Sequence, residues 1–307
     1  MILCCGEALI DMIPVSSADG RTAYAPHVGG AVFNTAVALG RLGAPVGFFS
    51  GISSDFFGVE LEEALQASNV DLRHVHTSDR PTTLAFVKFD GDQANYLFYD
   101  ENSAGRMLRA DDLPVLGADV AALHFSCISL VPEPCGSTYE ALMQREHARR
   151  VIMLDPNLRP PFIKDAGGHR ERLTRMIGMA DIVKLSDVDL EWFGEDGDEA
   201  TIARRWLTRG PSLVVVTSGS KGARAYTASE RITVPARVVT VADTVGAGDT
   251  FNAGLLAGLN DAGLLTKESI RSLSASSLRS AMELAANAAA VTVSRPGANP
   301  PWRSELA

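Results

Sequence analysis

Cysteine is scarce in this sequence: among 307 residues, only positions 4, 5, 127 and 135 are cysteines. Their spacing matches no metal-binding motif, so the sequence predicts no zinc site. Cys4 and Cys5 are adjacent within an apolar run, as small core residues commonly are. A chain of this length with 46% hydrophobic residues can bury a large core without disulfides, and this cysteine usage fits a reducing compartment.

Positive charge and long hydrophobic runs are also scarce. The 28 Lys and Arg residues are outnumbered by 37 Asp and Glu residues, which gives a net charge of −9 and a pI near 5.2. This balance argues against a nucleic-acid partner. No apolar run approaches the ~20 residues that span a bilayer, and no basic segment precedes Glu7 and Asp11. We therefore expect a cytoplasmic protein with no membrane partner and no signal peptide.

Two common nucleotide-binding signatures are missing. The Gly-Ser-Lys-Gly sequence at residues 219–222 lacks the spacing of a Walker A motif. No G-x-G-x-x-G sequence follows the first predicted strand, which argues against a dinucleotide-dependent dehydrogenase.

Short apolar runs alternate with amphipathic segments along most of the chain. Residues 151–154 and 213–216 are apolar throughout, which indicates strands buried on both faces. We therefore predict an α/β fold in which a mainly parallel central sheet lies between two layers of helices. The predicted strands are 2–13, 46–50, 84–89, 121–126, 151–155, 182–185, 213–217 and 223–226, and the predicted helices include 34–42, 57–68, 139–149, 171–179 and 201–209.

Residues 12–28 and 84–99 depart from this alternation because they are strand-like and contain no helical pattern. Residues 87–96 are typical of a hairpin with its turn at Asp90–Gln93. We expect these strands to form a small projecting sheet that serves as a lid, a dimer contact or both. No linker of domain-separating length is present, so residues 1–307 are predicted to form a single domain.

The segment from Asp243 to Gly254 carries the clearest chemical signal. It follows a β-rich run at residues 232–241 and leads into a helical pattern. The glycines at its turn let the backbone approach a ligand, and the free N–H groups at a helix start bind anions. The segment alone also fits a simple packing turn.

Asp249 places a carboxylate where the anion should bind. A phosphate-binding turn with an adjacent carboxylate suggests phosphoryl transfer to a hydroxyl group, in which Asp249 accepts the proton. The N–H groups of Gly246, Ala247 and Gly248 would stabilise the developing charge. We expect the helix N-terminus to favour the ionised form of Asp249.

A second glycine-containing turn precedes another predicted helix. Gly29 and Gly30 would let hydroxyl groups approach the backbone, and the Asn34 amide could both donate and accept hydrogen bonds. An ordinary capped helix is the alternative. Asp11, near the end of the first strand, is placed to accept hydrogen bonds from sugar hydroxyls or is simply a polar residue at a strand end.

Together, the Gly29–Gly43 segment and the Asp243–Leu256 segment resemble the two signatures of the ribokinase-like sugar kinases, the phosphofructokinase-B-type family. The resemblance covers essentially the whole chain. It implies a ribokinase-like fold and ATP-dependent phosphorylation of a sugar, with Mg²⁺ and a homodimer formed through the small sheet. Residues 155–159 resemble the D-x-N-x-R segment of the fructokinase and ketodeoxygluconate kinase branches. The resemblance implies that Arg159 and Phe98 both contact the sugar.

The resemblance also implies a nucleotide side. Residues 184–189 correspond to a segment that commonly reads N-x-x-E, with Ser186 and Asp189 in place of Asn and Glu. Asp189 would then contact magnesium through water, and a monovalent cation such as K⁺ would lie near Asp243 and Val245. The residues implied to contact the nucleotide are Lys184, Thr217, Gly219, Gly222 and Asn287.

The substrate is less well defined. Asp100 stands where these branches often have Arg, and Arg would suit a carboxylated sugar. We therefore place fructose first, 2-keto-3-deoxygluconate next, and ribose or a nucleoside after them. The departures at Ser53, Ser186 and Asp189 leave open a protein of another class, a sugar-binding regulator without turnover, although the complete motif at Gly246–Asp249 argues against it.

Overall fold

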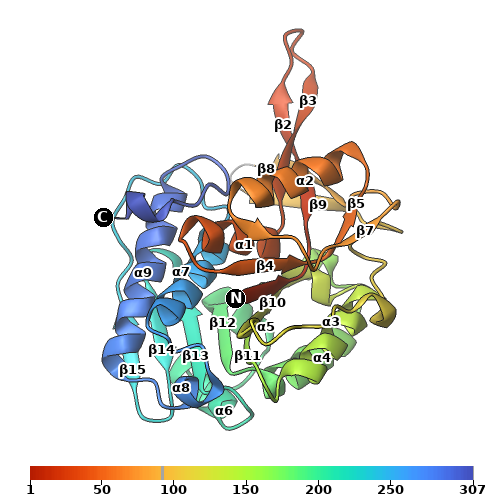
Figure 1. The fold of residues 1–307 in the computed structure, drawn as a ribbon. Coiled ribbons are helices and arrows are strands. Elements are labelled where there is room, and N and C mark those ends of the chain that lie inside the picture. The colour runs from red at the N-terminus through yellow and green to blue at the C-terminus, as the bar shows by residue number, and fades with distance from the viewer. Residues whose placement is uncertain (91–92, 307) are drawn as a thin grey trace.

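The computed structural model describes residues 1–90 and 93–306, and its largest element in that part of the chain is a nine-stranded sheet (Figure 1). Seven neighbouring strands are parallel, and two antiparallel strands complete one edge. In spatial order the strands are β15 (Arg231–Val234), β14 (Ala223–Tyr226), β13 (Leu213–Thr217), β12 (Ile182–Ser186), β11 (Val151–Asp155), β10 (Ala122–Ser126), β1 (Ile2–Cys5), β4 (Val46–Phe49) and β6 (Val70–Asp71).

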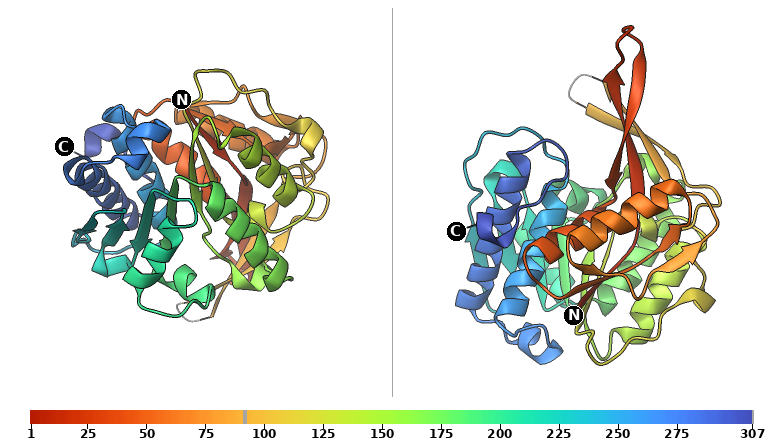
Figure 2. Two further views of the ribbon diagram at one scale, coloured as in Figure 1. Left: turned by 90° about the horizontal axis from the view of Figure 1, so that it is seen from below. Right: turned by 45° about the horizontal axis from the view of Figure 1, so that its top comes forward.

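Helices cover both faces of this sheet, because alternate side chains of each strand enter separate cores. In β11, Val151 and Met153 pack on one face, while Ile152 and Leu154 pack on the other. The predicted three-layer α/β/α fold is confirmed (Figure 2). The first face carries α1 (Ala31–Arg41), α2 (Phe56–Ala67), α7 (Ala247–Asp261), α8 (Lys267–Arg271) and α9 (Ala275–Val293), and the second carries α3 (Cys135–Glu146), α4 (Ala166–Met179), α5 (Asp187–Trp192) and α6 (Glu199–Leu207).

A four-stranded sheet projects from this body, as predicted (Figures 1 and 2). Its strands are somewhat longer than the sequence pattern indicated, and the predicted turn at residues 90–93 includes two positions outside the described residues. In spatial order the strands are β3 (Thr22–Gly29), β2 (Leu9–Ser16), β8 (Leu84–Asp90) and β9 (Gln93–Tyr99), and a separate pair is formed by β5 (Gly51–Ser53) and β7 (His76–Ser78).

Two predicted strands were wrong in extent. The run at residues 2–13 is divided, because the chain leaves the main sheet after Cys5 and enters the small sheet at Leu9. Gly6 lies at this division, where a Cβ atom would come within 2.4 Å of the Val32 side chain on α1. The run at residues 232–241 is a strand only as far as Val234; Pro235 follows and has no N–H to continue a ladder.

Most helices begin at a side-chain cap, but the two helices that approach each other at the site begin at glycines. Asp55, for example, accepts a hydrogen bond from the Gly58 N–H at 2.8 Å at the start of α2. Helix α1 starts after Gly30 (φ 110°) and α7 after Gly246 (φ 77°), and neither glycine has a side chain to occupy the helix end. Within the described residues, no helix combines the length and apolar character needed to cross a membrane.

Candidate active site

A cavity of about 270 Å³ lies where the small sheet meets the carboxyl ends of central strands and the amino ends of α1 and α7. Parallel sheets place ligands at this edge. Glu7 follows β1 and Asn157 follows β11, whereas Asp11 belongs to the small sheet. The lining residues are Glu7, Leu9, Asp11, Gly30, Ala31, Asn34, Tyr96, Phe98, Cys127, Ile128, Asn157, Arg159, Thr244, Val245, Gly246, Gly248 and Asp249.

Asp249 lies in the first turn of α7 and is held by two amides. Asn34 Nδ2 donates to Asp249 Oδ2 at 2.9 Å, and Asn157 Nδ2 donates to Oδ1 at 3.4 Å. Burial raises the pKa of Asp249 to about 6, against the opposing effects of Asn34 and the nearby cations. The expectation that the helix N-terminus would favour the ionised form is thus outweighed by desolvation, although a pKa of about 6 still leaves the carboxylate mainly ionised at neutral pH.

The predicted glycine pair lies at the side of the cavity that Asp11 lines. A Cβ atom on Gly29 would lie 2.3 Å from Asp11 Oδ2, and one on Gly30 would lie 2.9 Å from the Glu7 carbonyl oxygen. Gly30 lines the cavity, whereas Gly29 lies behind Asp11. Burial also raises the pKa of Asp11 to about 7. The pair therefore makes room for the Asp11 carboxylate and for the turn into α1.

Several cavity residues were not singled out from the sequence. Glu7 accepts hydrogen bonds from the Ala31 N–H at 2.8 Å and the Val32 N–H at 3.4 Å, so its carboxylate caps α1 from another segment. The sequence feature that could have identified Glu7 is its position directly after the first strand, where ligands of parallel sheets bind. Asn157 lies inside the recognised 155–159 segment, and Tyr96 shares the two-residue period of Phe98.

Asp100 lies outside this cavity. It forms an ion pair with Arg106 at 3.0 Å and lines a smaller neighbouring pocket. The argument that Asp100 favours a neutral sugar therefore does not hold, because its side chain does not line the sugar cavity. Arg159, by contrast, lines the cavity, where its Nη1 donates to Asn157 Oδ1 at 2.7 Å.

The residues implied to bind the nucleotide also lie outside the cavity lining. Thr217 and Gly219 follow one another closely at the carboxyl end of β13. Gly222 has φ 83°, and a Cβ atom there would lie 2.2 Å from the Val234 carbonyl oxygen. Asn287 on α9 accepts a hydrogen bond from Arg237. Lys184 is buried and forms an ion pair with Asp155 at 2.9 Å.

The carboxylates implied to bind cations are already engaged. Asp189 accepts hydrogen bonds from the Leu158 N–H at 2.8 Å and from the Ser186 N–H and hydroxyl at 3.0 and 2.7 Å. Ser186 and Asp189 therefore form a reciprocal capping box at α5. This carboxylate does not fit a direct magnesium ligand, and only a water-mediated contact is compatible with its bonds.

Asp243 is engaged in the same way. Its Oδ1 accepts from the Val245 N–H at 3.0 Å, and its Oδ2 accepts from the Gly297 N–H at 2.9 Å. These bonds fix the loop before α7 to the segment after α9. Among the described residues, no group of three or more His, Cys, Asp or Glu side chains is arranged to hold a metal ion.

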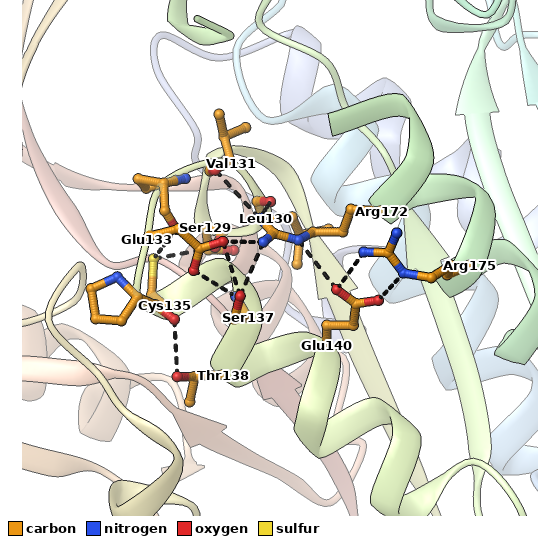
Figure 3. A network of polar contacts seen from close by, with 12 residues as sticks. Ser129, Leu130, Val131, Glu133, Cys135, Ser137, Thr138, Glu140, Arg172 and Arg175 are labelled. Carbon is orange, nitrogen blue, oxygen red and sulfur yellow. Dashed lines mark hydrogen bonds and ion pairs between the residues drawn. The ribbon is translucent and has the colours of Figure 1, made fainter. Parts of the chain in front are cut away.

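One wall of the cavity is held from behind by Arg172 of α4. The wall includes Cys127 and Ile128 of a short 3-10 helix, Cys127–Leu130. Arg172 Nη1 donates to the Leu130 carbonyl at 2.9 Å, and its guanidinium also pairs with Glu133 and Glu140 (Figure 3). This network joins α3 and α4 to the segment that bounds the cavity.

The fold and the site together define a class of protein. A buried carboxylate beside a glycine turn at a helix N-terminus, facing a cavity rich in hydrogen-bonding groups, is suited to phosphoryl transfer to an alcohol.

Comparison with known proteins identifies the family. Residues 1–305 match the model of the pfkB family of carbohydrate kinases. A fructokinase from Rhizobium leguminosarum bv. trifolii is 57% identical over 279 residues, covering 91% of this chain and 86% of that protein. A fructokinase from Klebsiella pneumoniae is 34% identical over 258 residues, covering 83% of this chain and 82% of that protein. The chain belongs to the pfkB family of carbohydrate kinases.

Solved structures agree with this assignment. A fructokinase from Xylella fastidiosa with bound ATP has a TM-score of 0.91 at 28% identity, covering 99% of this chain and 96% of that chain. A fructokinase from Vibrio cholerae O395 in a form with bound fructose, ADP and calcium ion has a TM-score of 0.83 at 27% identity, covering 97% and 94%. The ribokinase-like fold is confirmed, and the protein is an ATP-dependent sugar kinase.

Proposed function

We propose that this protein is a fructokinase that transfers the γ-phosphoryl group of ATP to a hydroxyl of fructose. The observation that carries the proposal is the position of Asp249, whose carboxylate lines the cavity at the first turn of α7. The 57% identity to a fructokinase over most of the chain supports fructose as the sugar.

In the proposed mechanism, Asp249 accepts the proton of the attacking hydroxyl. Asn34 and Asn157 orient its two oxygens, so the carboxylate is fixed before the sugar arrives. The transition state of phosphoryl transfer is loose in most analyses, so positioning and charge stabilisation contribute more than base strength. The N–H groups of Gly246 and Gly248, which line the cavity, stabilise the developing charge. The predicted contribution of Ala247 does not fit, because its N–H donates to the Thr244 carbonyl at 3.3 Å. Mg²⁺, when bound with ATP, supplies further neutralisation of phosphate charge.

The charges of the cavity favour a neutral, hydroxyl-rich sugar. Three carboxylates, those of Glu7, Asp11 and Asp249, line it together with a single guanidinium, that of Arg159. Carboxylates accept hydrogen bonds from hydroxyls, but they repel a carboxylated sugar such as 2-keto-3-deoxygluconate.

A panel of acceptors tests the proposal. ADP release from MgATP would be measured with fructose, 2-keto-3-deoxygluconate, ribose and a nucleoside at matched concentrations. Fructose should give a kcat/KM at least tenfold above the others. A higher kcat/KM for another acceptor would replace fructose, and sugar binding without ADP release for any acceptor would favour the regulatory alternative.

We also propose that the nucleotide lies toward the loops after β12 and β13 and against α9, with Lys184, Thr217, Gly219, Gly222 and Asn287 in contact. In this arrangement Asp189 reaches magnesium through water, and K⁺ lies near Asp243 and Val245. The Vibrio cholerae fructokinase structures with bound ADP and a calcium or a potassium ion support the binding of a metal ion as well as the nucleotide. ADP release measured with Mg²⁺ alone and then with added K⁺ would test the monovalent cation.

The small sheet is proposed to act as the lid of the sugar cavity and as a dimer contact. Asp11, Tyr96 and Phe98 line the cavity from this sheet. Its strand β9 also exposes Leu97 and Tyr99, whose side chains alternate with those of Tyr96 and Phe98. An apolar face on a projecting sheet suits a second copy of the chain. The single-domain organisation and the cytoplasmic location remain predictions from the sequence.

A further inference from the structure

A buried polar cluster lies beneath the first turn of α7. Asp155 ends β11, Lys184 lies in β12, and Asn252 lies on α7 one turn after Asp249. Asp155 Oδ2 accepts from Lys184 Nζ at 2.9 Å and from Asn252 Nδ2 at 2.7 Å. Asp155 and Asn252 are 0% exposed, and Lys184 is 4% exposed. The cluster therefore ties α7 to the end of β11 and to the middle of β12.

The Lys184 ammonium faces the glycine turn. A Cβ atom placed on Gly248 would lie 3.1 Å from Lys184 Nζ. The charge thus sits directly behind the backbone that is proposed to receive the phosphoryl group. His124 of β10 also faces this region and contributes no charge, because burial lowers its pKa to about 3.

Stability does not account for this cluster. Burying an ion pair removes both groups from water, and the attraction between them often does no more than offset that loss. Asp155 Oδ1 and Asn252 Oδ1 are buried as well, and neither has a hydrogen-bond partner among the described residues. Unpartnered buried acceptors are destabilising, so a cluster of this kind calls for a role other than holding the core together.

We propose that the Asp155–Lys184–Asn252 cluster is a positioning device for phosphoryl transfer, in which Asn252 fixes the first turn of α7 and Lys184 supplies a permanent positive field to Asp249. The proposal rests on the role proposed above for Asp249. Lys184 acts through Asp249 and the turn, which differs from a role limited to holding the nucleotide.

The other charged groups around Asp249 do not replace the positive charge of Lys184. Arg159, after β11, is a second cation near the carboxylate, and Asp155 opposes both cations. Glu7 and Asp11 are carboxylates that lie across the cavity, and burial, with a smaller contribution from the charge of Asp249, raises the pKa of each. Removal of Lys184 therefore leaves Arg159 to oppose the carboxylates of Asp155, Glu7 and Asp11.

The test is the pH dependence of kcat/KM for fructose with saturating MgATP in the full-length protein. Lys184→Met should move the acidic limb upward by about one pH unit, which is about a tenfold loss of activity below the limb. Lys184→Arg keeps the charge and should leave the limb near its original position. Asn252→Ala keeps Lys184 but removes the amide donor to Asp155, so it should lower kcat without moving the limb, and it stays informative if Lys184→Met does not fold.

Lys267→Met is the matched control. Lys267 pairs with Asp181 at 2.8 Å just before β12, at the opposite end of that strand from the cavity. Its loss should lower the Tm without moving the limb. A folded Lys184→Met protein with an unmoved limb would overturn the proposal, and so would a change confined to the KM for ATP. Retained turnover in Asp249→Ala would instead overturn the role of Asp249 itself.

Discussion

Asp249 is buried, but its proposed role requires it to be ionised, and these two properties oppose each other. Its side chain is 7% exposed, so desolvation favours the neutral acid, but proton transfer requires the carboxylate. The two amide donors and the nearby cations restore part of the lost stabilisation. The result is a carboxylate whose pKa of about 6 lies close to neutral pH, which suits the general base that we propose.

The raised pKa predicts an acidic limb in the activity profile. A carboxylate must be ionised to accept a proton, so kcat/KM should fall tenfold per pH unit once the pH drops below about 6. Activity should rise with pH and continue to rise through pH 7, because the carboxylates of Glu7 and Asp11, with pKa values of about 7, also become ionised there. A profile that stays flat from pH 7 to pH 5 would contradict this interpretation.

We predict that removing the Asp249 carboxylate reduces turnover but does not weaken nucleotide binding. Asp249→Ala should reduce kcat by on the order of 10²–10⁴, because the hydroxyl loses its proton acceptor. ATP affinity, measured by calorimetry on the same sample, should change little. Near-normal turnover in a folded variant would remove Asp249 from the role.

The glycine pair predicts a defect in sugar binding. Gly29→Ala would place a methyl group against Asp11 Oδ2 and force that carboxylate to move. Loss of a hydrogen bond to a charged group is worth about 1.5–3 kcal/mol, so the KM for fructose should rise about tenfold or more. Gly105→Ala is the control, because its nearest contact would be 3.6 Å. Equal KM values for the two variants would argue against Asp11 as a sugar ligand.

At the scale of helices and strands, the sequence pattern predicted the elements whose structure depends on neighbouring residues in the chain. The strand at residues 213–217 was predicted to the residue, because a short apolar run rich in β-branched residues is typical of a buried strand. The division of residues 2–13 could not be predicted, because it depends on contact between Gly6 and Val32 of α1. Residues 235–241 have strand propensity but pair with no strand in the described part of the chain, and Val238 is fully exposed.

The residues of the candidate site also fall into those that the sequence predicted and those that it did not. Gly246–Asp249 and Asn34 could be predicted, because an anion-binding turn and its amide partner belong to short recognisable segments. The capping of α1 by Glu7 could not, because the N–H groups of α1 lie more than twenty residues away in the chain. Cys127 has φ 63° and gave no signal at all, since nothing in its neighbours demands that conformation.

The support of the cavity wall predicts a difference between two arginines of α4. Arg172→Met should lower stability by about 2 kcal/mol and raise the KM for fructose, because Leu130 and Glu133 lose their shared donor (Figure 3). Arg175→Met should change stability by less than about 1 kcal/mol, since Arg175 is half-exposed and pairs with Glu140 alone. Thermal unfolding and KM values for the two variants would check this, and equal effects would contradict it.

At the scale of the molecule, the small sheet has two faces with different surroundings. Tyr96 and Phe98 are directed to the cavity, whereas Tyr24, Phe86 and Tyr99 form an edge-to-face aromatic row on the other face. The row is partly exposed, with Tyr99 at 54% and neighbouring Leu97 at 58%. A monomer rarely leaves such a row in water.

This exposure predicts a dimer through the small sheet. Leu97→Asp should convert the dimer to a monomer in light-scattering measurements, because a buried, unpaired charge opposes association. Val115→Asp, at a residue that is 91% exposed in another part of the chain, should leave the mass unchanged. A wild-type protein that is monomeric at all concentrations would contradict the prediction.

The placement of Asp11, Tyr96 and Phe98 on the small sheet has an evolutionary consequence. These three side chains, which we propose contact the acceptor, and α7, which carries the proposed base, belong to different parts of the fold. Substitutions in β2 or β9 can therefore alter which sugar is accepted while the first turn of α7 stays intact. Descendants of one ancestral chain can acquire new substrates through changes in a few strand residues and inherit the transfer chemistry unchanged.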